Sequence, residues 1–373
     1  MTTLTKASNQ WASRPADERF PSIEAMHSFC AGERALCGAA TLEDKSLHAE
    51  AVDGAVLLNG KTSKAMLTNW AFGQLANRAD APAAYLRTLP ATLAADCLNN
   101  GLKASTGTSR LLIQRAGLDA PSLTAQMISG VQADRPNLPT IRAITSDRYD
   151  RIWNSDITAR LVELKNNGTG WQEAPAAFDG SRGQYAGDRD CFSFFVDNDR
   201  RIFEKKAGGM SRGFFAWNSE VGSSVFGFMT FLYSYICGNH MVWNAENVSE
   251  LRVRHVGDAA SRAFGQLKGK LISYANNSAA TDELKIQRAM DYNLGTDKAS
   301  VLDAIFSMSK LGLPQKTAER AYAIAEEHSE WYGSPRSAWG YSNGLTEIAR
   351  DLPNAGDRVA MERIASKIVE LAF

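Results

Sequence analysis

The chain has 373 residues, which is enough for one large hydrophobic core and is more typical of two domains. Its 41 Lys and Arg residues are balanced by 41 Asp and Glu residues, so the overall basic excess of many nucleic-acid-binding proteins is excluded and any such role needs a local patch. The longest apolar stretch, Val221 to Cys237, carries no charge but is shorter than a typical membrane-spanning helix, so we expect no membrane segment.

The cysteines and the first residues of the chain bear on its location. The five cysteines are scattered, odd in number and without a Cys-x-x-Cys pair, which favours reduced thiols over a secreted disulfide framework. Residues 1–19 contain no apolar block ahead of their first charges, which argues against a secretory signal. We therefore expect a cytoplasmic protein.

The first hundred residues are predicted to be mostly helical. From residue 1 to about residue 50 the sequence indicates a weakly ordered arm followed by a helix. Residues 55–59 form a short apolar run that is typical of a strand. Apolar residues then recur with helical spacing over 63–78 and 90–102, and prolines separate these two helices.

Strands are predicted to dominate the middle of the chain. Apolar runs, several of them alternating, indicate strands over 109–115, 140–145, 191–196, 213–219, 223–229 and 251–255. The segment 231–236 suits either a strand or a helix. Together these runs predict an antiparallel or mixed sheet.

One helix is predicted to interrupt the strands. Ser155 or Asp156 would be its N-cap, because both side chains accept hydrogen bonds from the first backbone amides of a helix. Ile157, Leu161 and Leu164 would then share one face of that helix.

Beyond residue 258 the apolar period changes from two to nearly four, which predicts helices. Ala260, Phe264, Leu267, Leu271 and Tyr274, for example, fall on one helical face. The predicted fold class is therefore α+β, with an antiparallel or mixed sheet and flanking helices. We expect an N-terminal arm and helix over 1–50, the sheet domain over 51–257 and an all-helical domain over 258–373.

Short polar motifs lie between or at the ends of the predicted strands, at residues 146–149, 218–222 and 237–240. Polar side chains in such places lower stability unless a ligand or a protein group satisfies them. We therefore expect the three motifs to lie on one face of the protein and to form its functional site. Its candidate polar residues are Asp147, Tyr149, Asn218, Glu220, Asn239 and His255.

Two metal hypotheses can be tested against this pattern. Cys237 and His240 have the spacing of zinc ligands and His255 could be a third, but a fourth is not evident. We therefore expect no metal and no other cofactor, with the cysteine in the core. Asp147 and Glu220 are the best candidates for holding magnesium in an enzyme acting on nucleic acid or nucleotide, which requires them to lie close together.

Residues 200–212 are strongly basic, with five Lys and Arg residues, one acid and an aromatic ring. A glycine-containing hairpin of this composition is suited to track a phosphate backbone while the ring stacks on a base. A solvated loop that its charges keep soluble is the alternative. The candidate nucleic-acid-binding residues are Arg148, Arg151, Arg200, Arg201, Phe203, Lys205, Lys206, Arg212 and Arg254.

The succession of these motifs resembles a phage/plasmid-like family called domain of unknown function 932. The segments that carry the resemblance are Trp11 to Phe20, Tyr85 to Leu102, Ser146-Asp147-Arg148-Tyr149, Asn218-Ser219-Glu220-Val221-Gly222, Cys237-Gly238-Asn239 and Arg254-His255. It covers most of the chain, and His240 departs from it where the family is expected to have glycine. The resemblance implies an accessory protein of a phage or plasmid in a bacterial host cell, and no established activity.

The leading hypothesis is a non-enzymatic nucleic-acid-binding protein, with single-stranded DNA as its favoured partner and single-strand annealing as one form of that activity. A homo-oligomer would fit, because annealing proteins commonly form rings and a sheet edge can pair with another copy. The first alternative is an inhibitor that binds a host defence protein through the C-terminal helices. The second is the magnesium-dependent enzyme.

Overall fold

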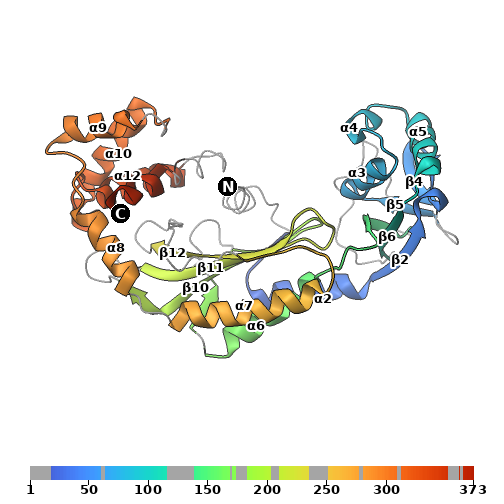
Figure 1. The fold of residues 1–373 in the computed structure, drawn as a ribbon, viewed down its shortest axis with the longest axis horizontal. Coiled ribbons are helices and arrows are strands. Elements are labelled where there is room, and N and C mark those ends of the chain that lie inside the picture. The colour runs from blue at the N-terminus through green and yellow to red at the C-terminus, as the bar shows by residue number, and fades with distance from the viewer. Residues whose placement is uncertain are drawn as a thin grey trace.

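The computed structural model describes residues 18–59, 64–115, 138–168, 170–173, 183–202, 210–234, 251–276, 280–308, 312–351, 361 and 364–373. Within these residues the fold is α+β, as predicted. Figure 1 shows a curved molecule, with a small N-terminal sheet at one end, a large sheet in the middle and helices at the other end. No helix in the described ranges is long and apolar enough to cross a membrane.

The N-terminal sheet has six strands in the order β2-β6-β7-β5-β4-β3. All neighbours are antiparallel except β5 and β7, which are parallel. The strands are β2 (Cys37–Glu43), β3 (His48–Val52), β4 (Ala55–Asn59), β5 (Lys64–Leu67), β6 (Thr108–Gln114) and β7 (Thr140–Ser146). The helices α3 (Asn69–Arg78), α4 (Ala83–Leu86) and α5 (Ala91–Ala104) share its hydrophobic core, and the short 3-10 helix η2 spans Asp44–Ser46.

The helix predicted over residues 63–78 begins later than the sequence pattern indicates. Residues 64–67 form β5 between β4 and β7, and Ala65, Met66 and Leu67 are all buried. A continuous apolar run suits a strand buried on both faces as well as a helix. Thr68 then begins α3 as its N-cap, with its Oγ1 accepting a hydrogen bond from Ala71 N at 3.1 Å.

The central sheet has seven strands, and every pair is antiparallel. The strand order is β1-β9-β10-β11-β12-β13, and β8 also pairs with β10. The strands are β1 (Arg19–Phe20), β8 (Trp171–Glu173), β9 (Gln184–Ala186), β10 (Cys191–Ile202), β11 (Met210–Asn218), β12 (Phe226–Ser234) and β13 (Leu251–Val253). Residues 231–234 are thus part of a strand.

One face of the central sheet packs on three helices, α2 (Ile23–Ala35), α6 (Asn154–Asn166) and α7 (Ala259–Asn276) (Figure 1). Alternation along the strands turns Phe195 and Phe214 toward these helices, where their rings stack with centroids 5.2 Å apart. Ile157, Leu161 and Leu164 are buried in the same core, which confirms the predicted face of α6.

The opposite face of the central sheet carries a row of aromatic rings. Phe192 stacks with both Tyr185 and Phe215, with 5.5 Å between ring centroids in each pair, and Phe215 lies 5.5 Å from Trp217. Gly227 on β12 lies under Trp217, and a Cβ at Gly227 would be only 2.2 Å from that ring. Glycine is therefore required where the indole crosses the neighbouring strand.

The remaining helices form a C-terminal lobe with its own cores. They are α8 (Ala280–Asp291), α9 (Lys298–Ser307), α10 (Gln315–Glu327), α11 (Ser329–Tyr332), α12 (Ala338–Asp351) and the 3-10 helix η5 (Glu370–Ala372). Met210, at the start of β11, packs with Ile286 and Trp339 and so joins the central sheet to this lobe.

The three predicted units differ from the cores that the structure forms. The range 258–373 contains α7, whose buried apolar residues, among those that the structure describes, belong to the core of the central sheet and not to the cores of the C-terminal lobe. The range 51–257 contributes to both sheets, and the range 1–50 supplies α2 to one core and β2 and β3 to the other sheet. An amphipathic helix such as α7 shows from its sequence that it has an apolar face, but not which partner covers that face.

Candidate functional site

The motif at residues 218–222 connects the central sheet to the N-terminal sheet. Asn218 ends β11, and the following backbone reaches α3, where Trp70 Nε1 and Gln74 Nε2 both donate to Val221 O at 2.9 and 2.8 Å. Gln74 Oε1 accepts from Ile144 N on β7 at 2.8 Å. We call this contact region, made by residues 218–222 with Glu33, Gln74, Arg142 and residues 149–154, the joint.

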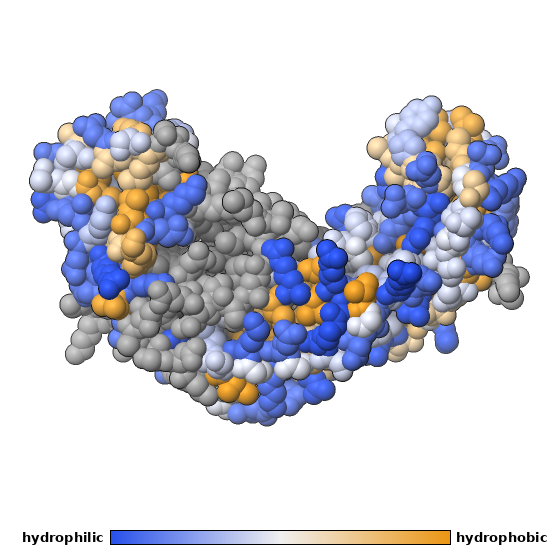
Figure 2. Space-filling model, in the orientation of Figure 1, coloured by the Kyte–Doolittle hydropathy of each residue, from blue (hydrophilic) through white to orange (hydrophobic). Residues whose placement is uncertain are grey.

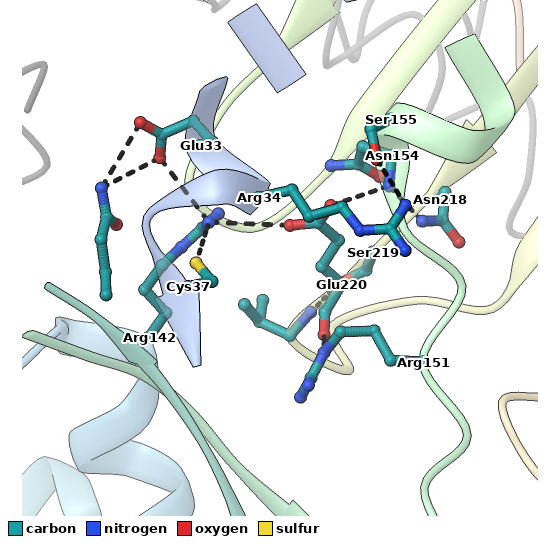
Figure 3. A network of polar contacts seen from close by, with 12 residues as sticks. Glu33, Arg34, Cys37, Arg142, Arg151, Asn154, Ser155, Asn218, Ser219 and Glu220 are labelled. Atoms are coloured by element: carbon teal, nitrogen blue, oxygen red, sulfur yellow. Dashed lines mark hydrogen bonds and ion pairs between the residues drawn. The ribbon is translucent and has the colours of Figure 1, made fainter. Parts of the chain in front are cut away.

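An ion triad lies buried in the joint. Arg142 projects from β7, and its Nη1 is 3.6 Å from Glu33 Oε2 on α2 and 3.6 Å from Glu220 Oε2 (Figure 3). All three side chains are at most 8% exposed. Burial opposes the charge of Arg142, but Glu220, Cys37 and Glu33 raise its pKa overall, and burial raises the pKa of Glu33.

The other carboxylate oxygen of Glu220 binds the first backbone amide of α6. Its Oε1 accepts from Asn154 N at 2.7 Å, and Asn218 Nδ2 donates to Asn154 Oδ1 at 2.8 Å and to Ile152 O at 2.9 Å (Figure 3). A carboxylate at this position satisfies a backbone amide that the first turn leaves unpaired and complements the helix dipole. The N-cap position is Trp153, which makes no side-chain cap, so the predicted capping by Ser155 or Asp156 is wrong.

The motif at residues 146–149 meets the Arg254-His255 pair in the same region. Tyr149 OH donates to Ser219 O at 2.8 Å, and its ring stacks on His255 with centroids 4.9 Å apart. Tyr149 also forms an isolated β-bridge with Val256, and Asp150 N donates to His255 O at 2.8 Å. Burial lowers the pKa of His255 to about 4, so this imidazole is neutral near pH 7.

Guanidinium groups and aromatic rings alternate within the joint and next to it. Arg34 lies 4.9 Å from the Trp153 ring centroid, and Arg151 lies 5.5 Å from Trp153 and 5.6 Å from Tyr149. Arg151 Nε also donates to Glu220 O at 2.8 Å. With His255 stacked on Tyr149, these groups form what we call the cation–aromatic column, whose four members other than His255 are partly exposed.

The structure brings four of the six predicted polar residues together. Tyr149, Asn218, Glu220 and His255 all lie in or against the joint, where protein groups are their hydrogen-bonding or stacking partners. Asp147 is exposed in the turn that follows β7. Asn239 is outside the described residues, as are Cys237 and His240.

The predicted magnesium ligands differ in their surroundings. Glu220 is buried and has Arg142 on one carboxylate oxygen and Asn154 N on the other, whereas Asp147 is exposed. Across the described ranges, no group of three or more His, Cys, Asp or Glu side chains is placed to hold a metal ion. Glu220 therefore acts as an ion-pair and capping partner in this structure.

The predicted nucleic-acid-binding residues also separate into groups. Arg148 and Arg254 are exposed next to the joint, and Arg151 is partly exposed within the cation–aromatic column. Arg200 and Arg201 belong to β10, but their side chains are not described, and Phe203, Lys205 and Lys206 are outside the described residues. The basic hairpin thus stays a prediction.

Arg212 requires a correction, because it does not lie on the surface. Its side chain is 5% exposed, its Nη1 donates to Tyr274 O at 2.8 Å, and its guanidinium lies 5.1 Å from the centroid of the Tyr274 ring. Position 212 has the same parity as Phe214, so alternation along β11 turns it toward the covering helices. Arg212 therefore links the central sheet to α7 through a hydrogen bond.

Glu33, Gln74 and Arg142 bring their side chains into the joint from outside the three polar motifs and were not among the candidate site residues. One signal could have identified Glu33, because Ile23, Met26, Cys30 and Glu33 follow helical spacing along one buried face of α2. A charged residue within an apolar stripe predicts a buried partner of opposite charge. The sequence does not indicate which arginine that partner is.

Comparisons of this chain with protein-family models, with curated proteins and with solved structures find no match.

Proposed function

We propose that this chain binds nucleic acid, with single-stranded DNA as the favoured partner, through the surface around the joint. The observation that carries the proposal is a pair of exposed arginines, Arg148 and Arg254, on the two segments that the Tyr149–Val256 bridge holds together. Within the part of the chain that the structure describes, neither guanidinium forms an ion pair. Both are therefore available for phosphate oxygens.

Three acids in and next to the joint already have partners, whereas Asp147 and Asp258 are exposed. Asp156 pairs with Arg34, and the Asp150 carboxylate accepts a hydrogen bond from Ala259 N at the start of α7. Glu220 faces Arg142. The negative charges within the joint are thus occupied by protein groups, so they compete less with phosphate for the outer arginines.

The cation–aromatic column supports the same proposal through preorganisation. Arg151 lies over two aromatic rings, with its Nε bonded to Glu220 O, so its conformation is restricted before any ligand arrives. An arginine side chain carries about 2 kcal/mol of rotamer entropy, and less of it is lost on binding when the guanidinium is already held. Partly exposed rings next to fixed cations are the combination that single-strand binding uses.

Figure 2 shows hydrophilic and apolar side chains next to each other in the middle of the face that it views, between the two ends of the molecule. A mixed surface of this kind suits a ligand with both charged phosphates and flat apolar bases. From the resemblance to the phage/plasmid-like family we further propose that the chain is an accessory protein of a phage or plasmid and acts in the cytoplasm of a bacterial host.

The test is fluorescence anisotropy with a labelled single-stranded oligonucleotide and with the duplex of the same sequence. The proposal expects the double variant Arg148→Gln/Arg254→Gln to weaken binding to oligonucleotides of different sequence by a similar factor, because phosphate contacts carry no sequence information. The matched control is Arg320→Gln, which removes an exposed arginine from α10. Equal affinity of the wild-type chain and the double variant would overturn the proposal.

A second candidate is binding to a host protein through the C-terminal lobe. Among its described residues the lobe exposes five large apolar side chains by at least 40%, namely Leu284, Tyr292, Phe306, Trp331 and Phe373. Exposed apolar side chains in such number on one lobe are consistent with a protein-binding surface. A stoichiometric protein that co-purifies with the wild type after nuclease treatment, and is lost in Phe306→Ser/Trp331→Ser, would support this candidate.

A further inference from the structure

A cleft of about 810 Å³ opens beside the joint, between α3, the start of α4 and the turn from β9 to β10. Two arginines line it from opposite sides, Arg87 after α4 and Arg189 before β10. Trp70 on α3 is the aromatic residue of the lining, and the cleft continues to Gly222 at the end of the joint motif.

Arg87 is held in place but incompletely bonded. Its guanidinium lies 5.1 Å from the centroid of the Phe72 ring, and its Nη2 donates to Asn69 O at 2.9 Å. Its Nε is buried and has no hydrogen-bond partner among the described groups. Because Arg87 as a whole is partly exposed, the rest of its guanidinium group can face an anion in the cleft.

Arg189 lies across the cleft on a fixed backbone. Ser223 Oγ donates to Arg189 O at 2.8 Å, and the exposed guanidinium lies 5.7 Å from the centroid of the Trp70 ring. It forms no ion pair with any residue that the structure describes. Trp70 is itself anchored, because its Nε1 donates to Val221 O.

The other polar groups that line the cleft include two side-chain amides, the first turn of α3 and one carboxylate. Asn69 and Asn77 on α3 are exposed amides, each of which can donate and accept hydrogen bonds. The first turn of α3 also faces the cleft, where the helix dipole favours negative charge. Asp188 contributes one carboxylate, which already has an interaction partner, so two guanidinium groups stand against one acid.

We propose that this cleft binds one nucleotide unit, with its phosphate at Arg87 and Arg189 and its base beside Trp70, within reach of Asn69 and Asn77. Guanidinium groups match phosphate oxygens, an aromatic ring matches a base plane, and side-chain amides match the hydrogen-bonding edge of a base. The inference goes beyond strand binding at the joint, because a free nucleoside monophosphate carries the same groups as one unit of a strand.

The experiment is a set of calorimetric titrations of the full chain with each nucleoside 5′-monophosphate, with inorganic phosphate and with a short single-stranded oligonucleotide. Nucleotide binding in the cleft predicts that at least one monophosphate or the oligonucleotide binds more tightly than phosphate. Arg189→Gln should weaken that binding by about tenfold or more, as expected for the loss of one charge-assisted contact. Arg189 is exposed, so this variant should keep the wild-type melting temperature, and Arg160→Gln, an exposed arginine on α6, is the matched control.

The results separate this proposal from strand binding at the joint. If a monophosphate binds and Arg189→Gln weakens its binding, the cleft binds a free nucleotide. If only the oligonucleotide binds and Arg189→Gln weakens its binding, the cleft binds one unit of a strand. If Arg189→Gln changes neither, or if phosphate binds as tightly as every nucleotide, the cleft proposal is overturned. Oligonucleotide binding that is lost only in Arg148→Gln/Arg254→Gln would overturn the cleft and leave the joint proposal standing.

Discussion

Arg142 and Glu220 lie 3.6 Å apart, Nη1 to Oε2, although Arg142 belongs to the N-terminal sheet and Glu220 follows the last residue of β11 in the central sheet. Both side chains are at most 5% exposed. A buried pair of this kind adds little net stability but makes the loss of one partner costly, because the other charge is then buried without full compensation. Together with Glu33, the pair links the N-terminal sheet to α2 and to the end of β11 in the central sheet.

Replacing Glu220 by Gln should destabilise the chain by about 3–5 kcal/mol, since Arg142 would keep only Glu33 as a charged partner. Urea denaturation followed by circular dichroism measures the effect. Glu327→Gln, an exposed change on α10, is the control and should leave the midpoint unchanged. A midpoint of Glu220→Gln equal to that of the wild type would contradict the role given to the triad.

His255 should make the stability of the fold depend on pH. Burial lowers its pKa from 6.5 to about 4, so between these values the unfolded chain binds a proton that the folded chain does not. The free energy of unfolding should therefore fall as the pH drops from 6.5 to 4, by up to about 3 kcal/mol. Stability measured against pH for the wild type and for His255→Gln checks this, and parallel curves would show that His255 does not titrate as stated.

Tyr149→Phe should cost about 1 kcal/mol, because it removes the hydrogen bond from Tyr149 OH to Ser219 O but keeps the ring. Tyr149→Ala should cost more, since it also removes the ring that stacks on His255 and lies next to Arg151. Thermal denaturation of both variants gives the comparison. An equal loss in the two would mean that the ring contributes nothing to the joint.

Gly227→Ala should destabilise the central sheet by about 1–3 kcal/mol, because the new Cβ would meet the Trp217 ring at 2.2 Å. The matched control is Gly265→Ala in α7, where a Cβ meets nothing within 4 Å and a helical glycine is replaced by a better helix former. The control should raise the melting temperature. If both substitutions shift it in the same direction, the close approach of Trp217 to Gly227 is not as described.

Local patterns predicted much of this fold. The alternation along β10 correctly separates Phe195, which packs under the helices, from Phe192, which joins the aromatic row on the other face, and the helical spacing of Ile157, Leu161 and Leu164 identifies a face that is buried in one core. Such patterns depend only on the period of the backbone, so one segment is sufficient to show them. They fail for β5, because three consecutive buried residues between two neighbouring strands show no period that separates a strand from a helix.

The candidate site was predicted in part, and the missing part is non-local. Tyr149, Glu220 and His255 do meet, since polar residues at strand ends tend to share an edge or a corner of a fold. The burial of Glu220 was not predictable, because its partners Arg142 and Asn154 come from other elements. The start of α6 could not be predicted from local sequence either, because its first backbone amide donates to Glu220, which is distant in the sequence, and not to a neighbouring side chain.

Nucleic-acid binding at the joint is tested most directly by the affinity of the chain for a single-stranded oligonucleotide across a series of salt concentrations. The logarithm of the association constant should fall linearly with the logarithm of salt concentration, by about 0.7 for each phosphate contacted. For Arg148→Gln/Arg254→Gln the slope should be shallower by about 1.4, because two contacts are lost. An affinity that does not change with salt, or the same slope for the double variant and the wild type, would contradict this account.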